Sequence, residues 1–432
     1  MTGKSSEKTQ SAVENAAEDL TKENEKTHER QRKNHPSGES LKNDALAGIV
    51  SSFSVIPEVV GFCLLAGVSP TLGLWTSIAF LILGSFLGGR PAMVSAGAGS
   101  MALVVVTLIA DYGTQYLFAA VLLAGVVQLI LGFLHADRLI RVVPASVMLG
   151  FVDALAIIIF SAQLSSLSGG SLLMFAFVGV AMLIVYLFPK LTNKVPSTLV
   201  ALVVVTVLSL LTGSTTPSIG AMAQISGGLP DLVLPALLLD PQTWVIVLPY
   251  AVSLAFVGLI ETMLTEQVVD EMTGTFGNAN RELKSQGIIN AVCSFLGAMP
   301  GCAMIGQAMV NVNSGGRGRA STLVAGTLLA AMVVFGGELL NYVPLAALVG
   351  VMITVAISTF DWKESRRELV EGFSNPVKTV ELATTLVTIG VVVATNNLAL
   401  GVGAGLVVYY GARMILGEFS LRDAIRRLKG RG

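Results

Sequence analysis

The chain has 432 residues, of which 53% are apolar and only 13% are charged, and its formal net charge is −1. A soluble domain carries charges on roughly 25% of its residues, so this composition excludes an ordinary soluble enzyme and indicates a membrane protein. The nearly neutral net charge gives no reason to expect nucleic acid as a partner. The high apolar content instead predicts that the lipid bilayer surrounds the protein.

The predicted elements begin after a charged segment. Residues 1–44 are rich in Lys, Glu, Asn and Thr and cannot bury enough apolar surface to fold, which predicts a disordered tail. From Ala45 to Leu416 apolar runs alternate with short polar connections, and a full membrane crossing needs about 20 residues. We predict an all-α polytopic protein whose fourteen spans lie near residues 46–66, 70–88, 99–110, 115–133, 146–165, 171–187, 196–212, 243–268, 286–298, 303–313, 320–337, 344–359, 376–395 and 398–416. The third and tenth spans are too short to cross alone.

The distribution of charge predicts the topology. When the N-terminal tail is placed in the cytoplasm, all 27 Lys and Arg residues fall on that side of the membrane. The opposite connections carry acidic residues but no Lys or Arg, namely Asp111, Asp231, Asp240 and Glu338. This pattern obeys the positive-inside rule and predicts a multi-pass protein of the plasma (inner) membrane with both termini in the cytoplasm.

An internal repeat accompanies this topology. Val143-Pro144, Gly150 and Ala156-Ile157 recur 200 residues later at Val343-Pro344, Gly350 and Ala356-Ile357. The two copies fall in the fifth and twelfth predicted spans, seven spans apart, so the second copy enters the membrane from the opposite side. Such an inverted repeat, here residues 45–212 and 243–416, places a transporter's binding site near the midplane.

Two segments rich in Pro and Gly precede the short spans. Residues 88–101 and 297–307 each lead into a half-helix, and irregular backbone survives at membrane depth only where protein or a cavity surrounds it. Helix N-termini carry free N–H groups and partial positive charge, so an anion is the natural ligand. The candidate substrate-binding residues are Ala98, Gly99, Ser100, Met101, Ala303, Met304, Ile305 and Gln307. The alternative is that both segments are only glycine-rich packing helices.

Intramembrane carboxylates are the other candidates. Glu261 and Thr265 lie four residues apart on one face of the eighth span, an arrangement that suits Na⁺ or a carried proton. Glu58 occupies the corresponding place in the first repeat by span order. Helix–helix hydrogen bonding is the alternative role for both carboxylates. Glu266 and Asp270 approach the cytoplasmic end and are expected to be solvated, and the three cysteines are expected to be packing residues.

These motifs resemble the SulP (sulfate permease) family of inorganic anion transporters over roughly residues 45–416. The matching segments are Ile56-Pro57-Glu58, Gly88-Gly-Arg-Pro91, Gly258-Leu-Ile-Glu-Thr-Met-Leu-Thr265, Asn280-Arg-Glu-Leu283, Gln286-Gly-Ile-Ile-Asn290 and Ser314-Gly-Gly316. The resemblance implies a fold of seven plus seven inverted spans with a core and a gate domain. It also implies elevator-type movement, anion binding between the third and tenth half-helices, and a cation or proton site at Glu261 and Thr265.

The sequence departs from the family pattern in two places. Many members carry an Arg near the start of the tenth span, where this chain has Gln307, so helix dipoles and a co-transported cation would balance the anion's charge. Members usually continue into a cytoplasmic STAS domain, whereas this chain ends at Gly432, so the resemblance covers the membrane domain only. Residues 417–432 are expected to form a short basic amphipathic helix.

The function that follows is secondary-active symport of a small inorganic or carboxylate anion, such as sulfate, bicarbonate or a dicarboxylate, with H⁺ or Na⁺. The alternatives are a nucleobase permease of the same fold and an anion channel. We expect no enzyme activity and no cofactor, because the spans contain no Ser/His, Cys/His or metal-binding constellation. The choice of coupling ion and the formation of a homodimer stay open.

Overall fold

The computed structural model describes residues 38–136, 143–192, 195–214, 216–222, 225, 228–230, 232–235, 240–395 and 397–416. Most of the predicted N-terminal tail, residues 1–37, lies outside the described residues, and so does the whole predicted C-terminal helix, residues 417–432. The same holds for four charged residues of the predicted connections, namely Arg138, Arg141, Lys194 and Asp231.

A helix lies at each of the fourteen predicted spans. These helices are α2 (Gly38–Ala66), α3 (Pro70–Leu87), α4 (Gly99–Tyr112), α5 (Thr114–Phe133), α6 (Ala145–Leu167), α7 (Leu172–Leu191), α8 (Ser197–Leu211), α10 (Pro241–Thr273), α11 (Ala279–Phe295), α12 (Ile305–Asn313), α13 (Arg319–Gly336), α14 (Leu345–Thr359), α16 (Pro376–Thr395) and α17 (Leu398–Ile415). Three short elements that were not predicted join them, namely α9 (Ile219–Met222), the 3₁₀ helix η3 (Gly337–Tyr342) and α15 (Trp362–Glu371).

Within the described residues, nine helices are long and apolar enough to cross a membrane, and the bent pair α14 and α15 would make a tenth. The chain is therefore an integral, multi-pass and mostly helical membrane protein. Helices α4 and α8 are apolar but shorter, and α12 has only nine residues. Fourteen crossings in two inverted halves stay a prediction.

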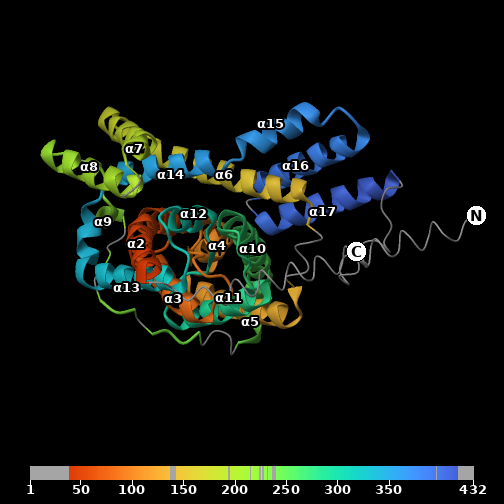
Figure 1. The fold of residues 1–432 in the computed structure, drawn as a ribbon, viewed down its shortest axis with the longest axis horizontal. Helices are drawn as coiled ribbons and strands as arrows, with labels where there is room; N and C mark the ends of the chain where they lie inside the picture. Colours follow the sequence, from red (N-terminus) through yellow and green to blue (C-terminus); the bar gives the residue numbers. More distant parts are fainter. Residues whose placement is uncertain are drawn as a thin grey trace, which may run out of the picture. The chain divides into compact units, whose positions relative to one another are not determined.

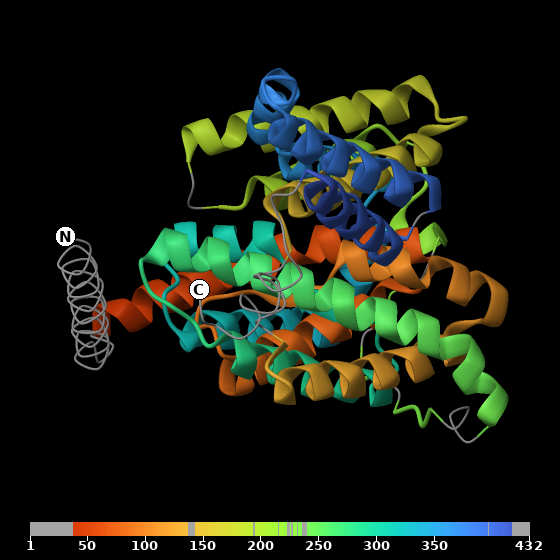
Figure 2. The same cartoon turned by 90° about the vertical axis from the view of Figure 1, so that its right-hand side faces the viewer.

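The helices from Asn43 onward pack in two groups, which Figures 1 and 2 show as two layers. The first, here called the core group, contains α2 to α5 and α10 to α13, with α5 against α10 and α11 and with α3 against α11 and α13. The second, the gate group, contains α6 to α8 and α14 to α17, in which α6 packs on α14 and α16. The names follow the two domains that the family resemblance implies.

The repeated glycines allow helices of the gate group to approach closely. A Cβ atom on Gly150 of α6 would lie 2.7 Å from Cβ of Thr388 on α16. A Cβ atom on Gly350 of α14 would lie 2.6 Å from Cβ of Ala181 on α7. By predicted span order these are contacts between spans 5 and 13 and between spans 12 and 6. Each contact is the counterpart of the other under an inverted repeat.

A short strand pair lies inside the core group and was not predicted. Strands β1 (Ser95–Gly97) and β2 (Gly301–Ala303) pair antiparallel, with Ser95 opposite Ala303 and Gly97 opposite Gly301. All six strand residues are buried. This pairing provides hydrogen-bond partners for backbone N–H and C=O groups of the two irregular segments, because each extended stretch supplies the groups that the other needs.

Candidate functional site

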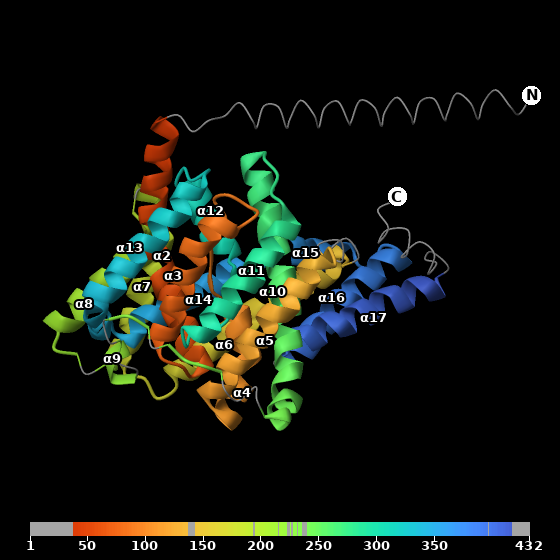
Figure 3. The same cartoon turned by 90° about the horizontal axis from the view of Figure 1, so that it is seen from below.

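Both half-helices begin at the strand pair. Helix α4 starts at Gly99, two residues after β1, and α12 starts at Ile305, two residues after β2. Their N-caps, Ala98 and Met304, have extended backbone and provide no side-chain cap. The first N–H groups of both helices therefore lack intrahelical and side-chain cap acceptors, and each helix end carries partial positive charge. Figure 3 shows α4 and α12 within the core group, beside α10.

The candidate substrate-binding residues are shielded in this structure. Seven of the eight are buried and Ile305 is half-buried, the seven being Ala98, Gly99, Ser100, Met101, Ala303, Met304 and Gln307. The ring of Phe62 on α2 covers Gly99, and a Cβ atom there would lie 2.5 Å from Cε1 of the ring. Only glycine at position 99 lets Phe62 pack so closely on the first turn of α4. Phe62 was not predicted, because one aromatic residue in an apolar run gives no signal.

Glu261 connects α10 to both irregular segments. Its carboxylate accepts hydrogen bonds from the hydroxyl of Ser100 on α4 and, at 3.1 Å, from the thiol of Cys302 on β2. Thr265 is fully buried, and its hydroxyl donates to the Glu261 backbone carbonyl at 2.8 Å. The structure thus places three of the candidate residues next to one another, namely Glu261, Thr265 and Ser100. It adds Cys302, whose interpretation as a packing residue is incomplete because its thiol also donates to Glu261.

Glu58 forms a separate pairing in the other half. It is 9% exposed and interacts with the side chain of Gln307 on α12. The Gln307 amide also donates to the backbone carbonyl of Ser54 at 3.2 Å. The carboxylate of the first repeat therefore lies against the half-helix of the second, and Glu261 lies against the half-helix of the first.

No group of three or more His, Cys, Asp or Glu side chains within the described ranges could hold a metal ion. Around Glu261 the oxygen atoms that a Na⁺ would meet are those of its own carboxylate, the hydroxyls of Ser100 and Thr265, and backbone carbonyls. This mixture of hard oxygen ligands suits an alkali or alkaline-earth cation better than a transition metal.

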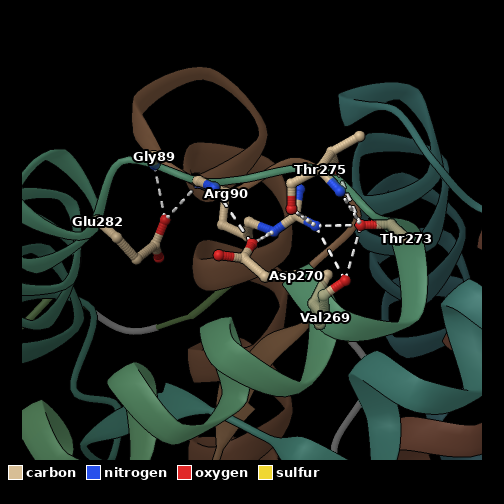
Figure 4. A network of polar contacts seen from close by, with 8 residues as sticks. Gly89, Arg90, Val269, Asp270, Thr273, Thr275 and Glu282 are labelled. Carbon is tan, nitrogen blue, oxygen red and sulfur yellow. Dashed lines mark hydrogen bonds and ion pairs between the residues drawn. The ribbon is translucent and has the colours of Figure 1, made fainter. Parts of the chain in front are cut away.

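The prediction that Glu266 and Asp270 are solvated is wrong for Glu266, which is buried, whereas Asp270 keeps 18% of its side chain exposed. Arg90, whose side chain is 3% exposed, forms an ion pair with Asp270 in which Nε and Oδ1 are 2.6 Å apart. Figure 4 shows the same guanidinium donating to the Val269 and Thr275 carbonyls. Glu266 is itself 5% exposed. The irregular segment before β1 folds over this part of α10 and contributes to the burial of Glu266, which the hydropathy of α10 alone does not reveal.

This Arg90 contact ties the start of the irregular segment to α10. Burial lowers the pKa of Arg90, while the charges of Asp270 and Glu266 oppose that shift. An arginine keeps its charge under such conditions because its ordinary pKa is so high. Arg90 therefore stays positively charged at physiological pH.

Replacing Arg90 by Met should destabilise the protein by about 3–5 kcal/mol, because the change leaves the Asp270 carboxylate without its buried partner. Thermal unfolding in detergent measures the loss. Arg281→Met is the matched control, since the exposed Arg281 only donates to the Phe86 and Leu87 carbonyls. Equal destabilisation by both variants would contradict the importance of the buried ion pair.

Comparison with known proteins identifies relatives of this chain. The model of the sulfate permease family matches residues 41–177 and 170–371. The putative sulfate transporter YbaR of Bacillus subtilis (strain 168) is 44% identical over 367 residues, covering 85% of this chain and 76% of YbaR. The bicarbonate transporter BicA of Picosynechococcus is 27% identical over 360 residues, covering 76% of this chain and 63% of BicA. The chain thus spans about two thirds to three quarters of the length of these relatives.

A solved structure has the same fold. The transmembrane domain of a cyanobacterium bicarbonate transporter BicA superposes with a TM-score of 0.72 and 25% identity, covering 86% of this chain and 98% of that domain. These relatives are named as transporters, which are not enzymes. The chain therefore belongs to the sulfate permease family.

Proposed function

We propose that this protein carries a small anion across the membrane by secondary-active transport, in symport with H⁺ or Na⁺. The observation that carries the proposal is the buried strand pair from which α4 and α12 both begin. It joins two uncapped helix N-termini to one carboxylate, Glu261, through Ser100 and Cys302. Helix N-termini stabilise an anion, and a carboxylate beside them needs a cation or a proton when the anion arrives.

The substrate of this proposal is sulfate, bicarbonate or a small dicarboxylate. The residues around the two helix starts are mostly Ala, Gly and Met, so binding would use backbone N–H groups with Ser100 and Gln307. Such a site selects by size and hydration rather than by reading ring edges, which argues against a nucleobase. The names of YbaR and BicA support sulfate and bicarbonate as the first anions to test.

The inverted arrangement of seven plus seven spans is part of the proposal. Three features pair each half with its counterpart, namely the mutual β1–β2 ladder, the Gly150 and Gly350 contacts, and the Glu58–Gln307 and Glu261–Ser100 pairings. An inverted repeat produces such reciprocal contacts naturally. In this topology both termini are cytoplasmic, and the core group moves past the gate group as an elevator.

Uptake into proteoliposomes tests the function. We expect radiolabelled sulfate, bicarbonate or fumarate to accumulate when an inward H⁺ or Na⁺ gradient is imposed, and to equilibrate without one. Competition by uracil or xanthine but not by anions would show a nucleobase permease instead. A single-channel conductance in planar bilayers, with no dependence of accumulation on either gradient, would show a channel.

A further inference from the structure

Helix α11 carries a stripe of polar side chains that the proposed mechanism does not use. Glu282, Gln286, Asn290 and Ser294 recur every four residues, and this spacing puts them on one face of the helix. All four are buried, with exposures between 0% and 4%. Polar groups buried among apolar helices are costly unless each is hydrogen-bonded, so their partners indicate what the stripe does.

The first two residues of the stripe hold the segment that enters β1. The Glu282 carboxylate accepts hydrogen bonds from the backbone N–H of Gly89 at 2.7 Å and of Arg90 at 3.1 Å (Figure 4). The Gln286 amide donates to the hydroxyl of Ser95, the first residue of β1, at 3.0 Å. One face of α11 therefore fixes this segment at two points.

Asn290 holds β2 in the same way that a neighbouring strand would. Its Oδ1 accepts from the backbone N–H of Gly301 at 3.0 Å, and its Nδ2 donates to the Gly301 carbonyl at 3.0 Å. This two-way exchange imitates the hydrogen-bonded pair of an antiparallel ladder. The Nδ2 atom also donates to Oε1 of Gln128 on α5 at 2.9 Å. The side-chain amide of Asn290 thus binds β2 through Gly301 and α5 through Gln128.

Two glycines bring Gln128 within reach. A Cβ atom on Gly287 would lie 2.7 Å from the Gly125 carbonyl oxygen, and a Cβ atom on Gly125 would lie 2.7 Å from that of Gly287. The backbones of α5 and α11 are therefore in direct contact, one turn from the Gln128–Asn290 hydrogen bond. In the sequence Gln286-Gly-Ile-Ile-Asn290, Gln286 hydrogen-bonds to β1 and Asn290 hydrogen-bonds to β2. The glycine between them allows α5 to pack closely against α11.

We propose that α11 sets the register of the two strands, and that Asn290 is a positioning residue for the anion site. Gly301 lies directly before Cys302 and Ala303. A shift of β2 would therefore move Cys302, whose thiol donates to Glu261, together with the start of α12. The effect on transport depends on the function proposed above, whereas the effect on strand position does not.

The test compares Asn290→Leu and Asn290→Asp with the control Ser294→Ala. Leu removes every side-chain hydrogen bond of Asn290, and Asp keeps an acceptor for Gly301 N–H but loses the donor. Ser294 belongs to the same stripe but donates to the Phe118 carbonyl on α5 at 2.8 Å, away from both strands. Each variant is reconstituted at full length, and the KM and the maximal rate of anion uptake are measured separately.

A second measurement reads strand position without transport. All three cysteines are buried, with Cys302 on β2, Cys293 on α11 and Cys63 on α2. Membranes are treated with N-ethylmaleimide, and labelling of each cysteine is followed by peptide mass spectrometry. A displaced β2 exposes Cys302 alone, whereas general unfolding exposes all three.

We expect both Asn290 variants to raise the KM and the labelling rate of Cys302 by about tenfold, the effect of losing a buried hydrogen bond, and Ser294→Ala to change neither. The proposal is overturned if both Asn290 variants label Cys302 no faster than Ser294→Ala does. It is also overturned if all three cysteines become reactive together in both variants, because Asn290 then serves general stability only. Failure of the wild type to take up any anion would refute the proposed function and leave the labelling result to decide the role of Asn290.

Discussion

Oxidising a variant that carries Gly61→Cys and Met352→Cys should stop anion uptake, and reduction should restore it. Gly61 lies on α2 of the core group and Met352 on α14 of the gate group. A Cβ atom on Gly61 would lie 2.8 Å from Cγ and Sδ of Met352, so the two positions face each other across the group boundary. A disulfide holds its Cβ atoms about 3.8 Å apart and would prevent the core group from sliding.

The cross-link is formed in proteoliposomes and quantified on a non-reducing gel, and uptake is measured before and after dithiothreitol. We expect uptake to fall at least about tenfold in the oxidised protein, because movement between the groups is then blocked. The two single variants treated with the same oxidant are the controls for damage to the native cysteines. Unchanged uptake by fully cross-linked protein would exclude an elevator movement along this boundary.

Replacing Glu261 by Gln should abolish coupling to the ion gradient and leave the protein folded. Gln has nearly the same size and can still accept hydrogen bonds from Ser100 and Cys302, but it carries no charge and binds no proton. A symporter that loses its cation site cannot use the cation gradient. The accumulated anion should then fall to its equilibrium level, a loss of about tenfold when the imposed ion gradient is tenfold and one ion moves with each anion.

Accumulation is measured in proteoliposomes under an inward H⁺ or Na⁺ gradient, with thermal unfolding as the check on folding. Glu58→Gln is the matched control, because Glu58 has the same side chain in the other half and interacts with Gln307 instead of Ser100. Concentrative uptake that persists in Glu261→Gln would refute the coupling role of this residue. Equal loss in both variants would assign coupling to the two carboxylates jointly.

The sequence predicted where the helices lie because apolar runs and Pro or Gly breaks are local properties. It missed elements whose residues are polar. Helix α15 (Trp362–Glu371) was not predicted, since six of its ten residues are charged. Helix α11 starts at Ala279 rather than near residue 286, because the Asn278 side chain accepts from Arg281 N–H and begins the helix in a polar stretch.

The candidate site was predicted in its residues but not in its connections. The Pro and Gly breaks located the half-helices, yet strands of three residues are too short to show a period, so the β1–β2 pairing was not foreseen. The contacts of Cys302 and Arg90 with α10 join residues 41 and 180 positions apart. Pattern analysis of one sequence has no access to such distant partners.

The pairing of β1 with β2 also has a consequence for biosynthesis. A nascent chain that has reached residue 212 contains β1, but the partner strand at residues 301–303 has yet to be made. Until then the exposed backbone of Ser95–Gly97 cannot be buried in lipid without leaving its N–H and C=O groups unpaired. The first half must therefore wait in the insertion machinery or in contact with water, and a chain truncated before residue 301 should be recognised by membrane quality control as incomplete.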